Sequence, residues 1–222
     1  MKKFFIVVAG GKGMRMGAEI PKQFISLNGM PILMRTIHRL HHSVPEGKFI
    51  LVLPRNHVSM WKMLVEAHSF DIPVQIAYGG DTRFQSVKNG LELIHDDDAI
   101  VAIHDGVRPF VAETVVRQCF DVAFRCGTAI PAITPVDSVR LMQDNGDTEP
   151  FSRDKCYMVQ TPQTFNLQLL RRAYLQVYRP SFTDDASVVE SLPERITLVE
   201  GNKENIKITT QFDLKVAESL FE

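Results

Sequence analysis

The stretch FFIVVAGGKG, residues 4–13, joins a six-residue apolar run to a glycine-rich loop. A short and continuously apolar run is typical of a strand buried on both faces of a parallel sheet. The glycines that follow allow backbone N–H groups to approach an anion closely. The stretch therefore predicts a strand whose carboxyl end carries a phosphate-binding loop.

Apolar runs and segments of helical periodicity alternate along the chain on either side of this pattern. They predict strands at 49–53, 74–78, 99–104 and 128–133, and helices at 32–40, 58–68, 84–94, 113–126 and 167–178. This alternation is typical of an α/β fold, so we expect a Rossmann-like, mostly parallel twisted sheet with helices on both faces. Further on we expect a helix with Thr183 as its N-cap, short strands at 196–201 and 206–210, and a closing helix at 211–221.

Residues 136–159 break the alternation. The pair Asn145-Gly146 lies between two polar, alternating runs, which is typical of a β-hairpin. The segment is too polar for a core, so we expect a projecting arm on a single domain that spans 1–222. Two interpretations remain open, namely a solvated surface hairpin and an arm that embraces a partner subunit.

Composition excludes several classes of protein. The 222 residues are 45% hydrophobic and 23% charged, which is ordinary for a globular chain. The net charge of −1 argues against a nucleic-acid binder. No apolar run approaches the length of a membrane span, and the three cysteines form no CxxC pair, so we expect a cytoplasmic protein. We expect Cys119, Cys126, Trp61 and Met63 to be buried in helices.

The glycine-rich loop matches neither of two familiar phosphate loops. Met16 stands where the dinucleotide fingerprint needs glycine, and Gln23 follows Lys22 where a Walker loop needs serine or threonine. Arg15 and Lys22 nevertheless add two cations close to the glycines. The alternative interpretation is a tight turn between strand and helix with two surface cations.

Two other predicted strands also end in glycine and charge. GGDTRFQSV follows the strand at 74–78, and HDGVRP overlaps the end of the strand at 99–104. Because ligands in open parallel sheets bind at the carboxyl ends of strands, we expect these loops and the first loop to line one site.

Together these motifs resemble those of the 2-C-methyl-D-erythritol 4-phosphate cytidylyltransferases, a family within the nucleotidyltransferase superfamily. AGGKGMRM with PKQ, GGDTRFQSVKNGL and HDGVRP stand where that family has A-[AG]-G-x-G-x-R-M with P-K-Q, GG-x-x-R-x-x-S-V-x-x-G-L and H-D-A-A-R-P. QTPQTF, TDDAS and VEGNKENIKIT follow in the family's order. Gly106 and Val107 replace two alanines, and Ser138 stands where threonine is usual.

The resemblance implies transfer of CMP from CTP to 2-C-methyl-D-erythritol 4-phosphate, with release of pyrophosphate. It implies catalytic roles for Arg15, Lys22, Arg153 and Lys207, and CTP binding by Ala9, Gly10, Gly11, Gly13, Gly80, Asp81 and Ser86. It assigns the polyol phosphate to Asp105, Arg108, Ser138, Arg153, Thr161, Thr183 and Lys207. It also implies Mg²⁺ or another divalent cation on Asp105, and a homodimer in which each arm completes the partner's site.

Other functions stay open at this point. Ribitol 5-phosphate cytidylyltransferases share several motifs but tend to have T-D-A where this chain has TDDA, which favours methylerythritol phosphate. A nucleotide sensor without activity and a sugar-1-phosphate nucleotidyltransferase for another base are further alternatives. His104 with Asp105 could belong to a metal phosphohydrolase, and Asp184 with Asp185 to a second metal site. We favour a strand-end histidine for His104 and a helix start for the aspartates.

Overall fold

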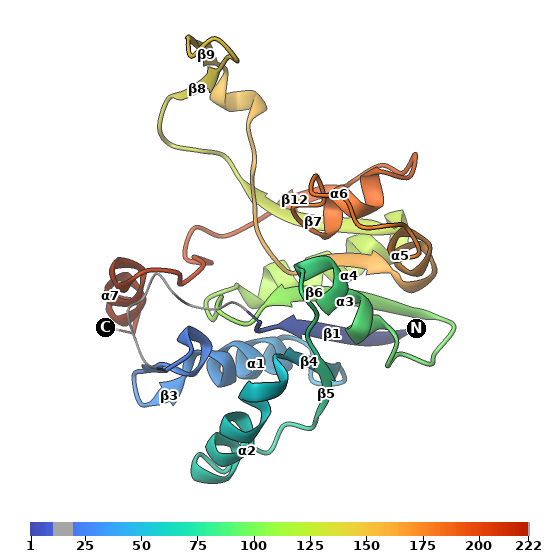
Figure 1. Cartoon of the computed structure of the whole chain (residues 1–222), viewed down its shortest axis with the longest axis vertical. Coiled ribbons are helices and arrows are strands. Elements are labelled where there is room, and N and C mark those ends of the chain that lie inside the picture. Colours follow the sequence, from blue (N-terminus) through green and yellow to red (C-terminus); the bar gives the residue numbers. More distant parts are fainter. Residues whose placement is uncertain (11–19, 222) are drawn as a thin grey trace.

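A mostly parallel β-sheet forms the centre of the molecule, whose computed structural model describes residues 1–10 and 20–221 (Figure 1). The strands lie in the order β10 (Met158–Val159), β7 (Thr128–Ile133), β11 (Gln163–Asn166), β6 (Ala99–Asp105), β1 (Lys2–Val8), β4 (Lys48–Leu53) and β5 (Val74–Tyr78). β12 (Leu198–Glu200) pairs with β7. β1 pairs in parallel with β4 and β6, whereas β11 runs antiparallel to β6 and β7. The Rossmann-like prediction is confirmed, and the antiparallel β11 is an addition that the sequence did not predict.

Two apolar layers cover the faces of the sheet. Successive strand residues point to opposite faces, so Phe5 and Val7 pack in one cluster while Phe4 and Ile6 pack in the other. The first cluster includes residues of α1 (Ile32–Ser43), α2 (Val58–Ala67) and α4 (Glu113–Cys126), and the second includes residues of α3 (Arg83–Leu91), α5 (Leu167–Tyr174) and α6 (Asp185–Glu190). Helices therefore lie on both faces, as predicted.

Smaller elements close the molecule at the edge where β1 and β6 end. A short hairpin of β2 (Ser26–Leu27) and β3 (Met30–Pro31) turns at Gly29, whose φ of +81° suits glycine. The C-terminal helix α7 (Gln211–Ser219) packs on this hairpin, and Leu27, Val107 and Ala217 share a small apolar cluster. The described residues also form three short 3₁₀ helices, at Lys22–Phe24, Arg55–His57 and Arg153–Lys155.

The predicted hairpin forms and projects from the body of the molecule. β8 (Val139–Met142) and β9 (Thr148–Phe151) pair antiparallel, and Gly146 has a φ of +89° in the turn between them. Figure 1 shows this hairpin at the far end of a long excursion from β7, well away from the sheet. The projecting arm of the sequence prediction is therefore confirmed.

Several local predictions were wrong. Asp184, and not Thr183, caps α6, because the Asp184 carboxylate accepts a hydrogen bond from Ser187 N–H and a capping box forms. Residues 206–210 form no strand; Ile208 N–H makes one bond to the Val107 carbonyl. Met63 is 62% exposed because it lies two positions, and so slightly more than half a helical turn, from the buried Trp61. Cys119 is buried, but Cys126 is exposed at the last residue of α4.

No helix among the described residues combines the length and the apolar character that crossing a membrane requires.

Candidate active site

A cavity of about 300 Å³ opens at the carboxyl ends of β1, β5 and β6. The residues that line it and that the sequence singled out are Ala9, Gly10, Lys22, Gly80, Asp81, Ser86, Asp105 and Lys207. The three loops that we expected to share one edge of the sheet therefore do so. Gly11, Gly13 and Arg15 lie outside the described residues.

The loop between β5 and α3 forms one wall of this pocket. Gly80 N–H donates to Ser86 Oγ at 3.1 Å, and Ser86 Oγ donates to the Thr82 carbonyl at 2.9 Å. Thr82 caps α3, because its side chain accepts a hydrogen bond from Gln85 N–H. A Cβ on Gly80 would lie 2.3 Å from Gln85 Cγ, so glycine is needed for this close approach. Hydrogen bonds with the start of α3 therefore hold this wall of the pocket in place.

Asp105 lines the same pocket, at the end of β6, and pairs with two cations. Its Oδ2 atom is 3.0 Å from Lys207 Nζ and 3.2 Å from Arg108 Nε. Burial would raise the pKa of this carboxyl, but Lys207, Arg83 and Arg108 together hold the pKa well below its usual range. Asp105 is therefore ionised at neutral pH and holds two cations at the pocket.

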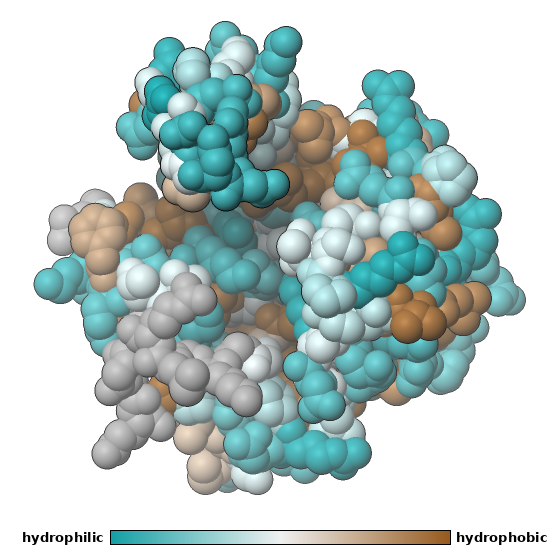
Figure 2. Space-filling model, turned by 45° about the horizontal axis from the view of Figure 1, so that its top comes forward, coloured by the Kyte–Doolittle hydropathy of each residue, from teal (hydrophilic) through white to brown (hydrophobic). Residues whose placement is uncertain are grey.

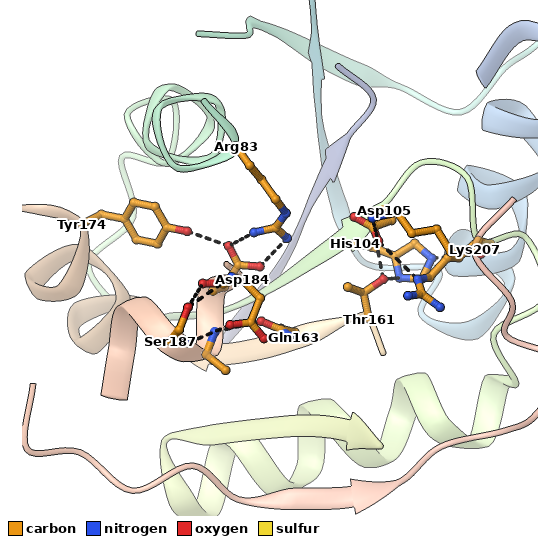
Figure 3. Close-up of polar contacts among 12 residues, drawn as sticks. Arg83, His104, Asp105, Thr161, Gln163, Tyr174, Asp184, Ser187 and Lys207 are labelled. Atoms are coloured by element: carbon orange, nitrogen blue, oxygen red, sulfur yellow. Dashed lines mark hydrogen bonds and ion pairs between the residues drawn. The ribbon is translucent and has the colours of Figure 1, made fainter. Parts of the chain in front are cut away.

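His104 is buried directly behind Asp105 and lies against Thr161 (Figure 3). Its Nδ1 atom is 3.1 Å from Thr161 Oγ1, and its Nε2 atom is 3.0 Å from the Arg108 carbonyl. Thr161 Oγ1 also accepts a hydrogen bond from Asp105 N–H at 3.1 Å. Burial lowers the pKa of His104 to about 4, so the ring is neutral at pH 7. These bonds favour the strand-end interpretation of His104.

Five of the seven predicted substrate residues lie outside the lining of this cavity, and two of these five, Arg108 and Thr161, contact Asp105. Ser138 and Arg153 belong to the projecting arm, where Arg153 Nη1 donates to the Val136 carbonyl at 2.7 Å. Thr183 is exposed just before α6. The structure of one chain therefore brings together Lys22, Asp105 and Lys207, with Arg108 and Thr161 on Asp105, but not the arm residues.

The described residues hold no group of three or more His, Cys, Asp or Glu side chains that could share a metal ion. Asp105 is placed to supply one oxygen, because its Oδ2 atom is already paired with Lys207 and Arg108. A single carboxylate suits Mg²⁺ that keeps several waters and is bound by substrate phosphates. The pocket therefore fits a metal that arrives with a triphosphate better than a metal caged by protein.

A model of the 2-C-methyl-D-erythritol 4-phosphate cytidylyltransferase family matches residues 4–222. The chain belongs to this family. The cytidylyltransferase of that name from Bacteroides fragilis is 53% identical over 215 residues, which cover 97% of each chain. That from Bacteroides thetaiotaomicron is 48% identical over 220 residues, which cover 99% of this chain and all of the other.

Solved structures of cytidylyltransferases agree with the fold. The 4-diphosphocytidyl-2C-methyl-D-erythritol synthase of Anaerococcus prevotii matches with a TM-score of 0.85 and 28% identity, covering 99% of this chain and 96% of the other. The Francisella tularensis 2-C-methyl-D-erythritol 4-phosphate cytidylyltransferase matches with a TM-score of 0.81 and 29% identity, covering 99% of each chain. The similarity thus spans both the body and the arm.

Two pocket residues of this cytidylyltransferase were missed by the sequence reasoning. Gln23 is 1% exposed, and its Nε2 atom donates to the Ala9 carbonyl at 2.9 Å, where the glycine loop begins. Arg83 lines the pocket and pairs with the buried Asp185. Both stand inside motifs that the sequence offered, PKQ and GGDTRFQSV, but only tertiary contacts reveal what their side chains hold.

The two acidic residues at the start of α6 have structural partners. Asp184 caps the helix and accepts a hydrogen bond from Gln163 Nε2 at 2.8 Å, and Asp185 pairs with Arg83. These contacts support the helix-start interpretation over a second metal site.

Proposed function

We propose that the pocket at the carboxyl ends of β1, β5 and β6 is the active site of this enzyme. The enzyme is a cytidylyltransferase that transfers CMP from CTP to 2-C-methyl-D-erythritol 4-phosphate. The products are 4-diphosphocytidyl-2-C-methyl-D-erythritol and pyrophosphate. The observation that carries the assignment of the site is the arrangement of Lys22, Asp105 and Lys207 around one cavity beside the glycine loop.

The chemistry explains why the pocket needs no general base. The nucleophile is an oxygen of the substrate's own phosphate, which is already anionic at pH 7. This oxygen bonds to the α-phosphorus of CTP, and the bond from that phosphorus to the oxygen bridging to the β-phosphate breaks. Catalysis then depends on positioning and on neutralising charge. Together the triphosphate and the monoester carry about five to six negative charges, which repel one another as they approach.

We assign the nucleotide to the side of the pocket formed by β1 and α3. Lys22 would neutralise charge on the α-phosphate and on the departing pyrophosphate, and the family resemblance gives Arg15 the same role. Gly80, Asp81 and Ser86, with the backbone near Ala9 and Gly10, would bind cytidine. When bound, Mg²⁺ would neutralise charge on the phosphate oxygens, and Asp105 would offer it one oxygen.

We assign the polyol phosphate to the side where Lys207 and Arg108 meet Asp105. Both cations are held within 3.2 Å of one carboxylate oxygen, so they are oriented before a substrate phosphate arrives. Thr161 and Thr183 would complete this side.

In a homodimer, the arm of one chain would supply Ser138 and Arg153 to the active site of the other chain. The space-filling view shows the arm tip as a mostly hydrophilic knob separated from the body by a hollow (Figure 2). Apolar side chains are nevertheless exposed along the arm, at Val136, Met142, Tyr157, Met158 and Val159. A hairpin isolated in water is only marginally stable, so packing against a second copy would explain both the arm and its apolar residues. We place this reaction of water-soluble phosphates in the cytoplasm.

A substrate panel tests the proposal. Pyrophosphate release is measured with CTP, UTP, ATP and GTP, each paired with 2-C-methyl-D-erythritol 4-phosphate or ribitol 5-phosphate. We expect turnover with CTP and the methylerythritol phosphate at a kcat/KM well above every other pair. A preference for ribitol 5-phosphate or for another nucleotide would overturn the substrate assignment, and nucleotide binding without turnover would favour the sensor.

A further inference from the structure

A buried carboxylate outside the residues assigned above joins three helices beside the pocket. Asp185 is fully buried at the start of α6, and its two oxygens accept hydrogen bonds from Arg83 Nη1 at 2.7 Å and Nη2 at 2.6 Å. The Tyr174 hydroxyl, on α5, donates to the same carboxylate at 2.6 Å. Figure 3 shows the side chains of Arg83 and Tyr174 pointing toward one another. Bidentate pairing fixes orientation as well as distance.

Arg83, which binds the Asp185 carboxylate, belongs to the nucleotide side of the pocket. Arg83 lines the cavity and is the first residue of α3, directly after the capping Thr82. The bonds from Gly80 to Ser86 and from Ser86 to Thr82 tie the pocket wall to the same first turn. A displacement of Arg83 would therefore move the wall that we assign to cytidine.

Asp185 belongs to the segment that adjoins the polyol-phosphate side of the pocket. Asp185 follows Thr183 and the cap Asp184, and Gln163 holds this segment against β11. Gln163 Nε2 donates to Asp184 Oδ2 at 2.8 Å, and Gln163 Oε1 accepts from Ala186 N–H at 2.9 Å. Thr161, whose hydroxyl accepts from Asp105 N–H, lies two residues before Gln163. The start of α6 is thus fixed to the strand that supports Asp105.

The charges of the contact keep it intact at neutral pH. Burial lowers the pKa of Arg83, but the adjacent Asp185 carboxylate outweighs burial and raises it above its ordinary value. Burial and then Asp185 raise the pKa of Tyr174 well above its ordinary value, so the hydroxyl stays protonated and can donate. The carboxylate therefore keeps a cation on one side and a neutral donor on the other.

We infer that Arg83 is a positioning residue which, through Asp185 and Tyr174, fixes the nucleotide side of the pocket relative to the polyol-phosphate side. This inference rests on the proposed function. Each substrate would bind through the contacts of its own side, while the rate of transfer would depend on how the two sides are placed. Loosening the contact should therefore lower kcat more than it raises either KM, since small misplacements of reacting atoms are costly.

Tyr174→Phe is the mildest variant. It removes one hydroxyl and keeps the ring that stacks on Phe84 with centroids 4.7 Å apart. Its matched control is Tyr178→Phe, because Tyr178 packs near the same ring at 5.9 Å but is 44% exposed. We expect Tyr174→Phe to lower kcat at least about threefold with both KM values within about twofold, and Tyr178→Phe to leave kcat unchanged.

Asp185→Asn is the stronger variant, since it removes the charge that Arg83 faces. We expect kcat per folded enzyme to fall about tenfold or more, with KM values for CTP and the polyol phosphate within about threefold of wild type. Glu194→Gln is its control, because Glu194 forms a similar 2.6 Å ion pair with Arg172 on the exposed surface. Folded fractions are measured by circular dichroism at the assay temperature.

Two results would overturn the inference. One is a kcat per folded enzyme within about twofold of wild type in both Tyr174→Phe and Asp185→Asn. The other is a loss that appears wholly in KM. If Asp185→Asn does not fold, Tyr174→Phe alone decides between these outcomes. Wild-type enzyme without turnover on CTP and methylerythritol phosphate would instead overturn the proposed function, and the inference with it.

Discussion

The Asp105 carboxylate lies 3.0 Å from the Lys207 ammonium, although the two residues are far apart in the sequence. Lys207 precedes α7 and Asp105 ends β6, so the C-terminal part of the chain closes onto the end of a central strand. Arg108 approaches the same carboxylate oxygen at 3.2 Å. One anion thereby gathers two cations at the side of the pocket assigned to the polyol phosphate.

Replacing Asp105 should release both cations. We expect Asp105→Asn to lower kcat/KM at least about 100-fold even at saturating Mg²⁺, because the neutral amide no longer orients Lys207 and Arg108. Wild-type turnover should stop in excess EDTA and return with Mg²⁺. The exposed Asp121, replaced by Asn, is the control. Full activity in EDTA would contradict the metal-assisted mechanism, and full activity of Asp105→Asn would contradict the role of this carboxylate.

Lys22 should act mainly on the transition state. Charge grows on the α-phosphate and on the leaving pyrophosphate as the bond breaks, and Lys22 lines the pocket on the nucleotide side. We expect Lys22→Ala to lower kcat about 100-fold or more while the KM for CTP rises far less. The exposed Lys62, replaced by Ala, should behave as wild type. A higher KM for CTP with an unchanged kcat would mean that Lys22 contributes only to binding CTP in the ground state.

The arm should act on the partner's site. Arg153→Ala and Lys22→Ala chains should each be inactive as homodimers, but a mixed dimer has one intact site if Arg153 acts in trans. Random exchange of equal amounts gives about half mixed dimers, so activity should return to about a quarter of wild type. Mass spectrometry of the assembled dimers verifies the exchange. Demonstrated exchange without recovery would mean that Arg153 acts within its own chain.

His104 should make the fold sensitive to acid. The unfolded chain binds a proton on this imidazole near pH 6.5, whereas burial lowers the pKa in the folded chain to about 4. The contribution of His104 is therefore fully present above about pH 6.5 and is lost as the pH falls towards 4. We expect the loss of this contribution to lower the free energy of unfolding by about 2 kcal/mol as the pH falls from 7 to 5.

Urea denaturation at several pH values measures this contribution. The variant His104→Asn should show a shallower dependence on pH across this range, and the exposed His68, replaced by Asn, should keep the wild-type slope. Equal slopes for wild type and His104→Asn would show that His104 does not cause the acid sensitivity.

The sheet and its functional edge could be predicted because their signals are local. The apolar runs of β1, β4 and β6 and the glycines after β1, β5 and β6 are visible in the sequence alone, and the ends of parallel strands meet at one edge. β11 could not be predicted, because its four residues, QTFN, show no apolar run. It is a strand because its backbone pairs with β6 and β7 on both sides.

The candidate site could be predicted only in part, because it depends on contacts between distant segments of the chain. The sequence motifs assign Lys22, Asp105 and Lys207 to one site, and all three residues line the cavity. The pairing of Arg83 with Asp185 joins two motifs through the folded core, and nothing local distinguishes Asp185 from Asp184. The cap of α6 was placed one residue early for the same reason, since Thr183 and Asp184 are both good capping residues.

The path of the phosphate oxygens tests the central claim most directly. 2-C-methyl-D-erythritol 4-phosphate, labelled with ¹⁸O in its non-bridging phosphate oxygens, is incubated with CTP and Mg²⁺, and both products are analysed by ³¹P NMR. Attack of the substrate phosphate on the α-phosphorus predicts ¹⁸O in the bridge of the new diphosphate and none in pyrophosphate. Label in pyrophosphate, or a bridge oxygen that comes from CTP, would contradict CMP transfer to the polyol phosphate at this site.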